Sequence, residues 1–170
     1  MGVNLKEIEK KYLITLSPEV LESRKKQSFK KESIWQSYIS YDPEMRIRRI
    51  CSSCCVSIHT KHDLTFKSDG GLERDEITVT LTRLQYEQFY THIKHHEIEK
   101  ERYHIQLDDD LVAELNIYRG RLENLVTVEV EFRCCERASQ FSPPYWFGKD
   151  VTDCKRYKNK ELSKTVLPFE

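Results

Sequence analysis

The sequence has little glycine or proline, no excess of either charge and no long apolar run. Gly and Pro contribute five residues each to the 170, which excludes collagen-like and low-complexity chains and leaves no flexible linker between domains. The 28 basic residues balance the 28 acidic ones, whereas a general nucleic-acid or anionic-membrane binder needs a basic excess. The apolar runs are far too short to span a bilayer. We therefore expect a protein that binds neither nucleic acid nor membrane.

Signals for export or lipid attachment are also missing. Residues 1–7 lack the apolar core of a secretory signal peptide, and Lys6 stands where a myristoylation motif prefers Ser or Thr. We expect a cytoplasmic protein in which the six cysteines are reduced thiols. Cys51 and Cys54 have the spacing of a zinc knuckle, but no second ligand pair follows at a familiar distance, which favours free thiols.

Length and composition indicate one globular domain. Hydrophobic residues make up 38% of the chain and charged residues 33%, an ordinary balance for a folded protein with a polar surface. At 170 residues the chain is long enough to bury a core. Because no internal repeat or linker divides it, we expect a single domain over residues 1–170.

Alternation of apolar and polar residues, typical of β-strands, recurs along most of the chain. The pattern predicts strands at 5–14, 34–40, 45–50, 56–67, 72–81, 99–106, 111–118 and 125–132. Three helices are expected: one over 20–26 after the cap Ser17-Pro18, one after the capping box that begins at Thr82, and a short one over 136–141. This order predicts a mainly β (α+β) fold, an eight-stranded antiparallel β-barrel with a few flanking helices.

The strands are unusual because their polar positions carry repeated charged residues. Five of them carry charges at positions i and i+2; for example, Glu7 and Glu9 precede Lys11, and Arg46 is followed by Arg48. Solvated charge explains any single strand, but five strands with paired charges sorted by sign favour a charged barrel interior. Such an interior suits a polyanion with divalent cations, because carboxylates hold the metal and Lys or Arg neutralise phosphoryl oxygens. The opposite faces predict an apolar shell: Ile47, Ile77, Val79, Val128, Val130 and Phe132.

The motif Glu7-Ile8-Glu9-Lys10-Lys11 resembles the ExExK signature of the CYTH superfamily, the triphosphate tunnel metalloenzymes. Further segments match that family in order along nearly the whole chain, and the tail is similar to that of the small bacterial inorganic triphosphatases. The matching segments are 45–48, 65–67, 70–76, 99–103, 128–132, 146–148 and 153–159. The resemblance implies an eight-stranded tunnel whose end is closed by the tail.

The resemblance also implies an activity and a set of site residues. The expected reaction is hydrolysis of inorganic tripolyphosphate to pyrophosphate and phosphate, with Mg²⁺ or Mn²⁺ as cofactor. The implied metal ligands are Glu7, Glu9, Glu76, Glu114, Glu129 and Glu131. The implied triphosphate-binding residues are Lys11, Arg46, Arg48, Lys67, Arg74, Lys155, Arg156 and Lys158. Lys100 and Arg102 are the expected catalytic residues, and we hypothesise that Lys100 assists proton transfer.

Two departures from the family pattern keep other functions open. Thr78 and Asn116 stand where small members often carry acids, so a second metal site is expected to be weaker or absent. Thiamine triphosphatase and class IV adenylate cyclase remain alternatives within the family, and a non-catalytic polyphosphate- or nucleotide-binding module remains outside it. The expected partner is a small-molecule triphosphate, and the protein is expected to be a monomer or homodimer.

Overall fold

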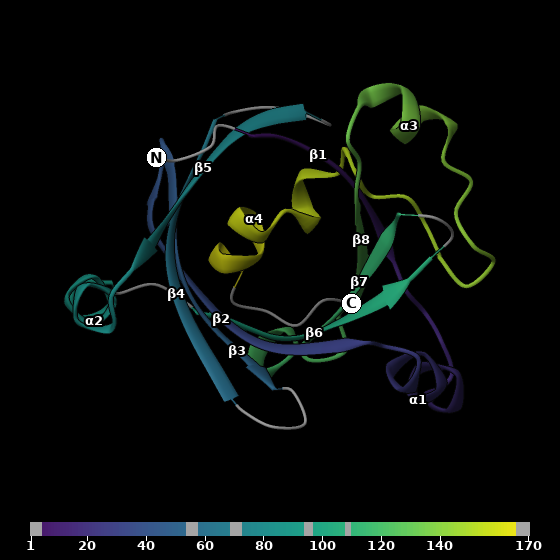
Figure 1. Ribbon diagram of the computed structural model, residues 1–170, viewed down its shortest axis with the longest axis horizontal. Coiled ribbons are helices and arrows are strands. Elements are labelled where there is room, and N and C mark those ends of the chain that lie inside the picture. The colour runs from purple at the N-terminus through teal and green to yellow at the C-terminus, as the bar shows by residue number, and fades with distance from the viewer. Residues whose placement is uncertain (1–4, 54–57, 69–72, 94–96, 108–109, 166–170) are drawn as a thin grey trace.

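The computed structural model describes residues 5–53, 58–68, 73–93, 97–107 and 110–165. Within them the chain forms a closed antiparallel barrel with the strand order β1-β5-β4-β3-β2-β6-β7-β8 (Figure 1). The strands are β1 (Leu5–Leu13), β2 (Lys30–Tyr41), β3 (Glu44–Ser53), β4 (Ile58–Lys67), β5 (Glu73–Leu81), β6 (Ile98–Gln106), β7 (Val112–Tyr118) and β8 (Val126–Glu131). The predicted mainly β barrel is confirmed.

Helices lie around and inside the barrel. They are α1 (Pro18–Lys26), α2 (Arg83–Thr91), α3 (Cys135–Gln140) and α4 (Asn159–Lys164), with 3-10 turns η1 (Gly120–Leu122) and η2 (Lys155–Tyr157). The predicted caps are present: Ser17 accepts a hydrogen bond from the Val20 backbone, and Thr82 and Gln85 form a reciprocal capping box. The sequence did not predict α4, which is one short turn-and-a-half with no side-chain cap.

The strand β2 is longer than predicted. Its first residues do not show the alternation of apolar and polar side chains that is typical of a strand. Lys30, Lys31 and Glu32 form a run of charge in the sequence, yet they pair in register with β6 from His104 to Arg102. Glu32 is buried and bonds Ser52 of β3 at 3.0 Å. From the sequence alone, such a run of charged residues resembles a loop. Its place in a strand becomes clear only from the neighbouring strands with which it pairs.

The main hydrophobic core lies outside the barrel wall rather than within it. Outward side chains of β1, β7 and β8 pack beneath α3 and the segment that contains Trp146 and Phe147; Figure 1 shows α3 over this side. Tyr12 and Phe147 contact each other there, with ring centroids 5.0 Å apart. Burial of this outer face leaves the inner face free to carry charge.

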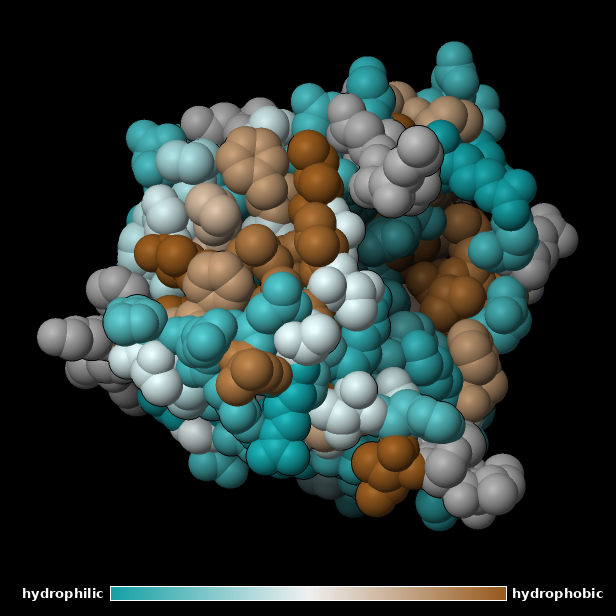
Figure 2. Space-filling view, turned by 60° about the vertical axis from the view of Figure 1, so that its left-hand side comes forward, coloured by the Kyte–Doolittle hydropathy of each residue, from teal (hydrophilic) through white to brown (hydrophobic). Residues whose placement is uncertain are grey.

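The predicted apolar shell is confirmed for Ile47, Val128, Val130 and Phe132, which are all buried. It is wrong for Ile77 and Val79 of β5, which are 39% and 50% exposed. These two side chains do point outward, but no described helix covers their part of the wall as α3 covers β8. Figure 2 shows hydrophobic side chains gathered on this side of the molecule.

The C-terminal helix α4 lies inside one end of the barrel (Figure 1). Its Leu162 is fully buried in a second hydrophobic cluster, which includes the inward-facing Tyr38 and Tyr118. Polar contacts fix the helix: Tyr118 donates to Asn159 Oδ1 at 2.9 Å, and Arg121 donates to the Leu162 carbonyl at 2.7 Å. The barrel is therefore closed at this end by the chain's own tail. None of the described helices is long and apolar enough to cross a membrane.

The seat of α4 makes a stability prediction. Leu162→Ala removes a fully buried side chain from the plug and is expected to lower the free energy of unfolding by about 2–5 kcal/mol. Leu84→Ala, on the exposed face of α2, is the matched control and is expected to stay within about 0.5 kcal/mol. Urea denaturation measures both, and equal losses in the two variants would contradict the packing described for α4.

Candidate active site

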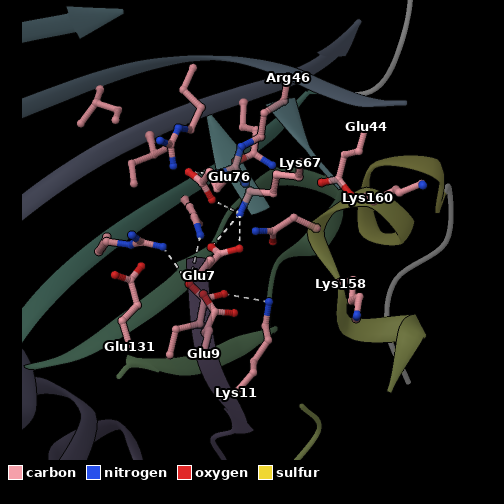
Figure 3. Close-up of a pocket in the computed structure, with 18 of the residues that line it drawn as sticks. Glu7, Glu9, Lys11, Glu44, Arg46, Lys67, Glu76, Glu131, Lys158 and Lys160 are labelled. Carbon is pink, nitrogen blue, oxygen red and sulfur yellow. Dashed lines mark hydrogen bonds and ion pairs between the residues drawn. The ribbon is translucent and has the colours of Figure 1, made fainter. Parts of the chain in front are cut away.

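Inward side chains of the strands surround a cavity of about 220 Å³ inside the barrel (Figure 3). Side chains alternate between the two faces of a strand, so residues at i and i+2 share the inner face once the barrel closes. Charged and polar groups dominate the lining: Glu7, Glu9, Lys11, Glu32, Gln36, Glu44, Arg46, Arg48, Lys67, Glu76, Lys100, Arg102, Glu129, Glu131, Thr152, Lys158, Asn159 and Lys160, beside Ile34 and Ile50. The prediction that the paired charges face inward is confirmed for the pairs whose side chains the structure describes.

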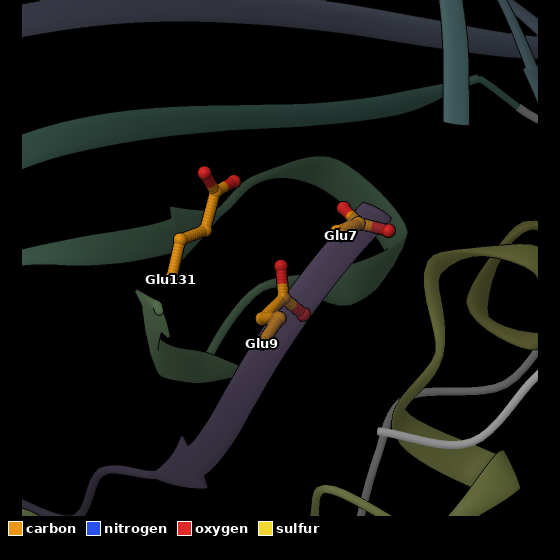
Figure 4. Close-up of side chains that lie close together, drawn as sticks. All are labelled: Glu7, Glu9 and Glu131. Atoms are coloured by element: carbon orange, nitrogen blue, oxygen red, sulfur yellow. The ribbon is translucent and has the colours of Figure 1, made fainter. Parts of the chain in front are cut away.

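Three carboxylates gather on one side of this cavity. Glu7 and Glu9 lie on β1, and Glu131 lies on β8 opposite Glu9 in the strand register (Figure 4). One oxygen from each of the three lies within 4.8 Å of the others. Cations lie nearby: Lys67 reaches Glu7, and the charges of Lys11 and Arg102 act on Glu9 and Glu131, respectively.

Protonation compensates for part of this crowding. Burial, followed by the charges of Glu129 and Glu7, raises the pKa of Glu9 to about 8. Removal from bulk water, followed by Glu114 and Glu7, raises the pKa of Glu131 to about 7. Carboxylates that cannot all ionise without a counter-charge fit a divalent cation, which prefers several hard oxygen ligands. The donor set of Glu7, Glu9 and Glu131 therefore fits Mg²⁺ or Mn²⁺.

Glu129 has different surroundings from these three. It is 2% exposed and lies among cations: Lys11 Nζ is 2.8 Å from its Oε1, and Arg102 Nη2 is 2.7 Å from its Oε2. Lys100 Nζ lies farther away, at 3.9 Å. Burial opposes ionisation of Glu129, but the charges of Lys100, Lys11 and Arg102 outweigh it and hold its pKa well below the usual range. The structure thus places this expected metal ligand at the centre of an ion-pair cluster.

Asn116 belongs to the same cluster. It accepts a hydrogen bond from Arg102 Nε at 2.9 Å and donates one to Glu129 Oε2 at 3.0 Å. An acid at this position would put a second negative charge beside Glu129, which is already fully buried. The Asn116 amide therefore forms hydrogen bonds with both Arg102 and Glu129 without adding charge. These two bonds account for an amide at this position in place of an acid.

A second cationic group lies across the cavity. Lys67 Nζ donates to both carboxylate oxygens of Glu7 at 2.7 and 2.8 Å and lies 2.5 Å from Glu76. Arg46 Nη2 is 3.9 Å from the same Glu76. The dashed lines of Figure 3 show these contacts around Lys67. Glu76 thus binds cations in this structure, and Thr78 donates to it at 3.1 Å.

Arg48 is oriented by a residue that the sequence analysis missed. Asp63 on β4 is 0% exposed and faces Arg48 in the register of β3 and β4. Two nearly parallel bonds join them, Nε to Oδ1 at 2.9 Å and Nη2 to Oδ2 at 3.2 Å. The signal was available, because Asp63, Thr65 and Lys67 alternate on one face of β4, but Asp63 lies outside the matching motifs.

Other lining residues also escaped the sequence analysis, although alternation pointed to several of them. Glu44 precedes Arg46 by two positions, and Gln36 follows Ile34 by two. Lys160 and Asn159 enter the lining only because α4 folds into the barrel; Figure 3 shows Lys158 and Lys160 on this tail. No strand periodicity marks such residues, since their position depends on the tertiary fold.

Some expected site residues lie elsewhere. Glu114 is not part of the cavity lining; it contacts Arg102 and lies 3.7 Å from His104 Nδ1. Lys155 and Arg156 are exposed on η2, whereas Lys158 lines the cavity. Arg74 belongs to β5, but its side chain lies outside the described residues.

Comparison with known proteins gives one curated relative and several similar structures. The chain is 40% identical over 107 residues to an inorganic triphosphatase of Nitrosomonas europaea, which is 63% of this chain and 71% of the relative. A crystal structure of an inorganic triphosphatase matches with a TM-score of 0.62 and 29% identity, over 95% of this chain and 96% of that one. A protein from Pyrococcus horikoshii, 16% identical with a TM-score of 0.54 over 78% and 82% of the two chains, shares the fold. No family model matches the chain.

The carboxylate cluster makes a prediction about stability and pH. The pKa of Glu9 is raised from 4.5 to about 8 in the folded protein. Between these values the folded state keeps a proton that the unfolded state releases, so stability is lost as pH rises through this window. Gln at position 9 cannot ionise, so Glu9→Gln is expected to gain stability relative to the wild type from about pH 5 to about pH 8.

Urea denaturation in the presence of chelator tests this expectation. The free energies of unfolding of both proteins are compared at several pH values across the window. Glu136→Gln, on the exposed end of α3, is the matched control and is expected to show a constant difference. A constant difference for Glu9→Gln as well would mean that Glu9 is not held protonated.

Proposed function

The chain belongs to the CYTH superfamily, the triphosphate tunnel metalloenzymes, and we propose that it hydrolyses inorganic tripolyphosphate to pyrophosphate and phosphate. The observation that carries the proposal is the arrangement of the cavity: a cluster of three carboxylates lines the same closed barrel as two groups of Lys and Arg, and one of these groups reaches Glu7 through Lys67. A chain of phosphates carries a high density of negative charge, and such a lumen can neutralise it along its length. The name of the relative from Nitrosomonas europaea supports the same substrate class.

We propose that Glu7, Glu9 and Glu131 hold Mg²⁺ or Mn²⁺. Their oxygens approach one another closely, and two of the three have a raised pKa because of burial and neighbouring acids. A bound divalent ion supplies charge neutralisation at phosphate oxygens and helps to orient or activate a water molecule. Glu129 and Glu76 serve a different role in this proposal, since each holds cationic side chains in position.

The cationic side chains bind and orient the triphosphate. Lys11, Lys100 and Arg102 surround Glu129 on one side, and Arg46 and Lys67 lie beside Glu76 on the other. Fixed charges of this kind need no reorganisation when charge develops on the transferred phosphoryl group, so they supply much of the rate. Asp63 holds Arg48 through two hydrogen bonds, and the Arg48 side chain lines the cavity.

Lys100 is the residue that we propose for proton transfer. It is buried, and burial together with the charges of Arg102 and Lys11 lowers its pKa well below the usual value, although Glu129 opposes this shift. An amine whose pKa is moved toward neutral pH gives up a proton more readily than an ordinary lysine. Lys100 also lines the cavity, where a substrate oxygen can reach it.

Preference for the inorganic substrate follows from the closed end. Lys158 and the α4 residues Asn159 and Lys160 line the cavity, so the tail occupies one end of the lumen and adds polar groups there. A free terminal phosphate fits such an end because Lys ammonium groups favour compact anionic oxygens.

Turnover of tripolyphosphate, ATP and thiamine triphosphate tests the proposal. Each is assayed with Mg²⁺, with Mn²⁺ and with chelator, and both phosphate and pyrophosphate are measured. Tripolyphosphate is expected to be the best substrate, and chelator is expected to abolish its hydrolysis. Pyrophosphate release from ATP without phosphate would identify a cyclase, faster turnover of thiamine triphosphate would change the substrate, and binding without turnover would indicate a binding module.

Asp63 generates a further kinetic prediction. Asp63→Asn keeps the shape of the side chain but weakens the charged fork that orients Arg48, so binding of the triphosphate suffers. The KM for tripolyphosphate is expected to rise by about tenfold, on the order of 1.4 kcal/mol, with a smaller change in kcat. Asp75→Asn, an exposed acid on β5, is the matched control and is expected to leave both constants unchanged. A fall in kcat alone would contradict a positioning role in substrate binding.

A further inference from the structure

A second hollow lies on the outer wall of the barrel, between α2 and the outward faces of β2 to β5. It has a volume of about 940 Å³ and shares no lining residue with the tunnel. The alternation of β3 explains this separation: Arg48 points into the lumen, whereas the next residue, Arg49, points outward into this groove. The groove, defined here by Trp35, Arg49, His62, Tyr86, Tyr90 and Glu97, is therefore a distinct surface.

Arg49 is held in place, and no described carboxylate forms a direct ion pair with it, although its charge acts on Glu97 in the same groove. Its guanidinium stacks on the Trp35 ring, 4.3 Å from the ring centroid. No described acceptor meets its buried Nε. Its neighbour Arg48 differs in this respect, because a buried carboxylate receives its fork. Because this guanidinium lines the groove without a carboxylate fork of its own, the groove is suited to a ligand that brings an anionic group.

The groove is electrically polarised. At one end His62 has a lowered pKa, chiefly because of burial and then because of the charges of Arg49 and Arg83. At the other end Glu97 raises the pKa of Tyr90 by its negative charge. Glu97 itself accepts a hydrogen bond from Ser37 at 3.3 Å. The groove therefore contains both a cationic side chain, Arg49, and a carboxylate that can accept hydrogen bonds, Glu97.

Aromatic rings connect the two ends. His62 and Tyr86 have centroids 4.7 Å apart, and Tyr86 stacks on Tyr90 at 5.8 Å with an interplanar angle of 18°. Tyr86 is buried against the wall, but Tyr90 is exposed and offers an open ring face. Stacking on such faces suits a planar heterocycle, because every nucleobase, whichever it is, presents a π-face.

We propose that this groove binds a small aromatic phosphate of the nucleoside monophosphate class, at a site separate from the tunnel. The phosphate pairs with the free donors of Arg49, since a guanidinium fork matches phosphate geometry. The base lies on the aromatic surface of Tyr90. Glu97 accepts a hydrogen bond from an exocyclic amine, which adenine, guanine and cytosine carry and uracil lacks.

Isothermal titration calorimetry with adenosine monophosphate tests the proposal, first alone and then with an excess of tripolyphosphate in chelator. One molecule is expected to bind per chain, and tripolyphosphate is expected not to displace it. Adenosine, which lacks the phosphate, and ribose 5-phosphate, which lacks the ring, are each expected to bind at least about tenfold more weakly. Displacement by tripolyphosphate would assign the binding to the tunnel, and equal binding of ribose 5-phosphate would leave only an anion contact; either result overturns the proposal.

Variants locate the site. Arg49→Ala is expected to weaken adenosine monophosphate binding by at least about tenfold, whereas Arg133→Ala, an exposed arginine after β8, is expected to leave it unchanged. Arg49 is not part of the tunnel, so tripolyphosphate turnover by Arg49→Ala serves as the check of folding. Trp35→Phe, which retains a ring under the guanidinium, provides a milder second variant with a smaller expected loss. Unchanged binding in Arg49→Ala, or no detectable heat with millimolar ligand, would refute the groove as a site.

Discussion

The ionised carboxylate of Glu129, fully enclosed by the barrel, is the interaction on which the interior depends. It lies within hydrogen-bond distance of Lys11, Arg102 and Asn116, which come from three different strands. A buried charge is tolerated only when its partners satisfy it. Removing Glu129 would leave two buried cations facing each other, so this residue lets the protein concentrate positive charge in a lumen. The same concentration is what a triphosphate requires.

The two kinds of charge are arranged differently within the lumen. Most of the cations are matched by acids, whereas Glu7, Glu9 and Glu131 crowd together, and the pKa values of Glu9 and Glu131 are raised. This difference separates the carboxylates that hold side chains from those suited to a metal ion. The sequence alone does not distinguish acids that pair with side chains from acids suited to a metal ion, because Glu129 and Glu131 are two positions apart on the same strand. Their partners on β1 and β6 decide which of them has cations for neighbours.

The barrel also uses its two faces for different purposes. Along β3 the inner face contributes Arg46 and Arg48 to the tunnel, and the outer face contributes Ile47 to the packed wall and Arg49 to the groove beside α2. Closure of the sheet makes this possible, since no edge strand remains to be protected. The plug α4 then closes one end with apolar contacts at Leu162 and adds Asn159 and Lys160 to the lining. A single short helix thus contributes to both stability and the site.

The sequence by itself determined the strand periodicity, and with it the inward direction of Glu7, Glu9, Lys11, Arg46, Arg48 and Glu129, because a strand alternates its faces whatever surrounds it. Helix starts at Ser17 and Thr82 were equally local, since capping depends on residues within one turn. Tertiary structure decided what depends on contacts distant in sequence. It placed Asp63 against Arg48, brought the uncapped tail into the barrel so that Lys158 lines the cavity while Lys155 is exposed, and left Ile77 and Val79 uncovered. Burial and pairing arise only when separate strands meet, and no pattern within one strand contains that information.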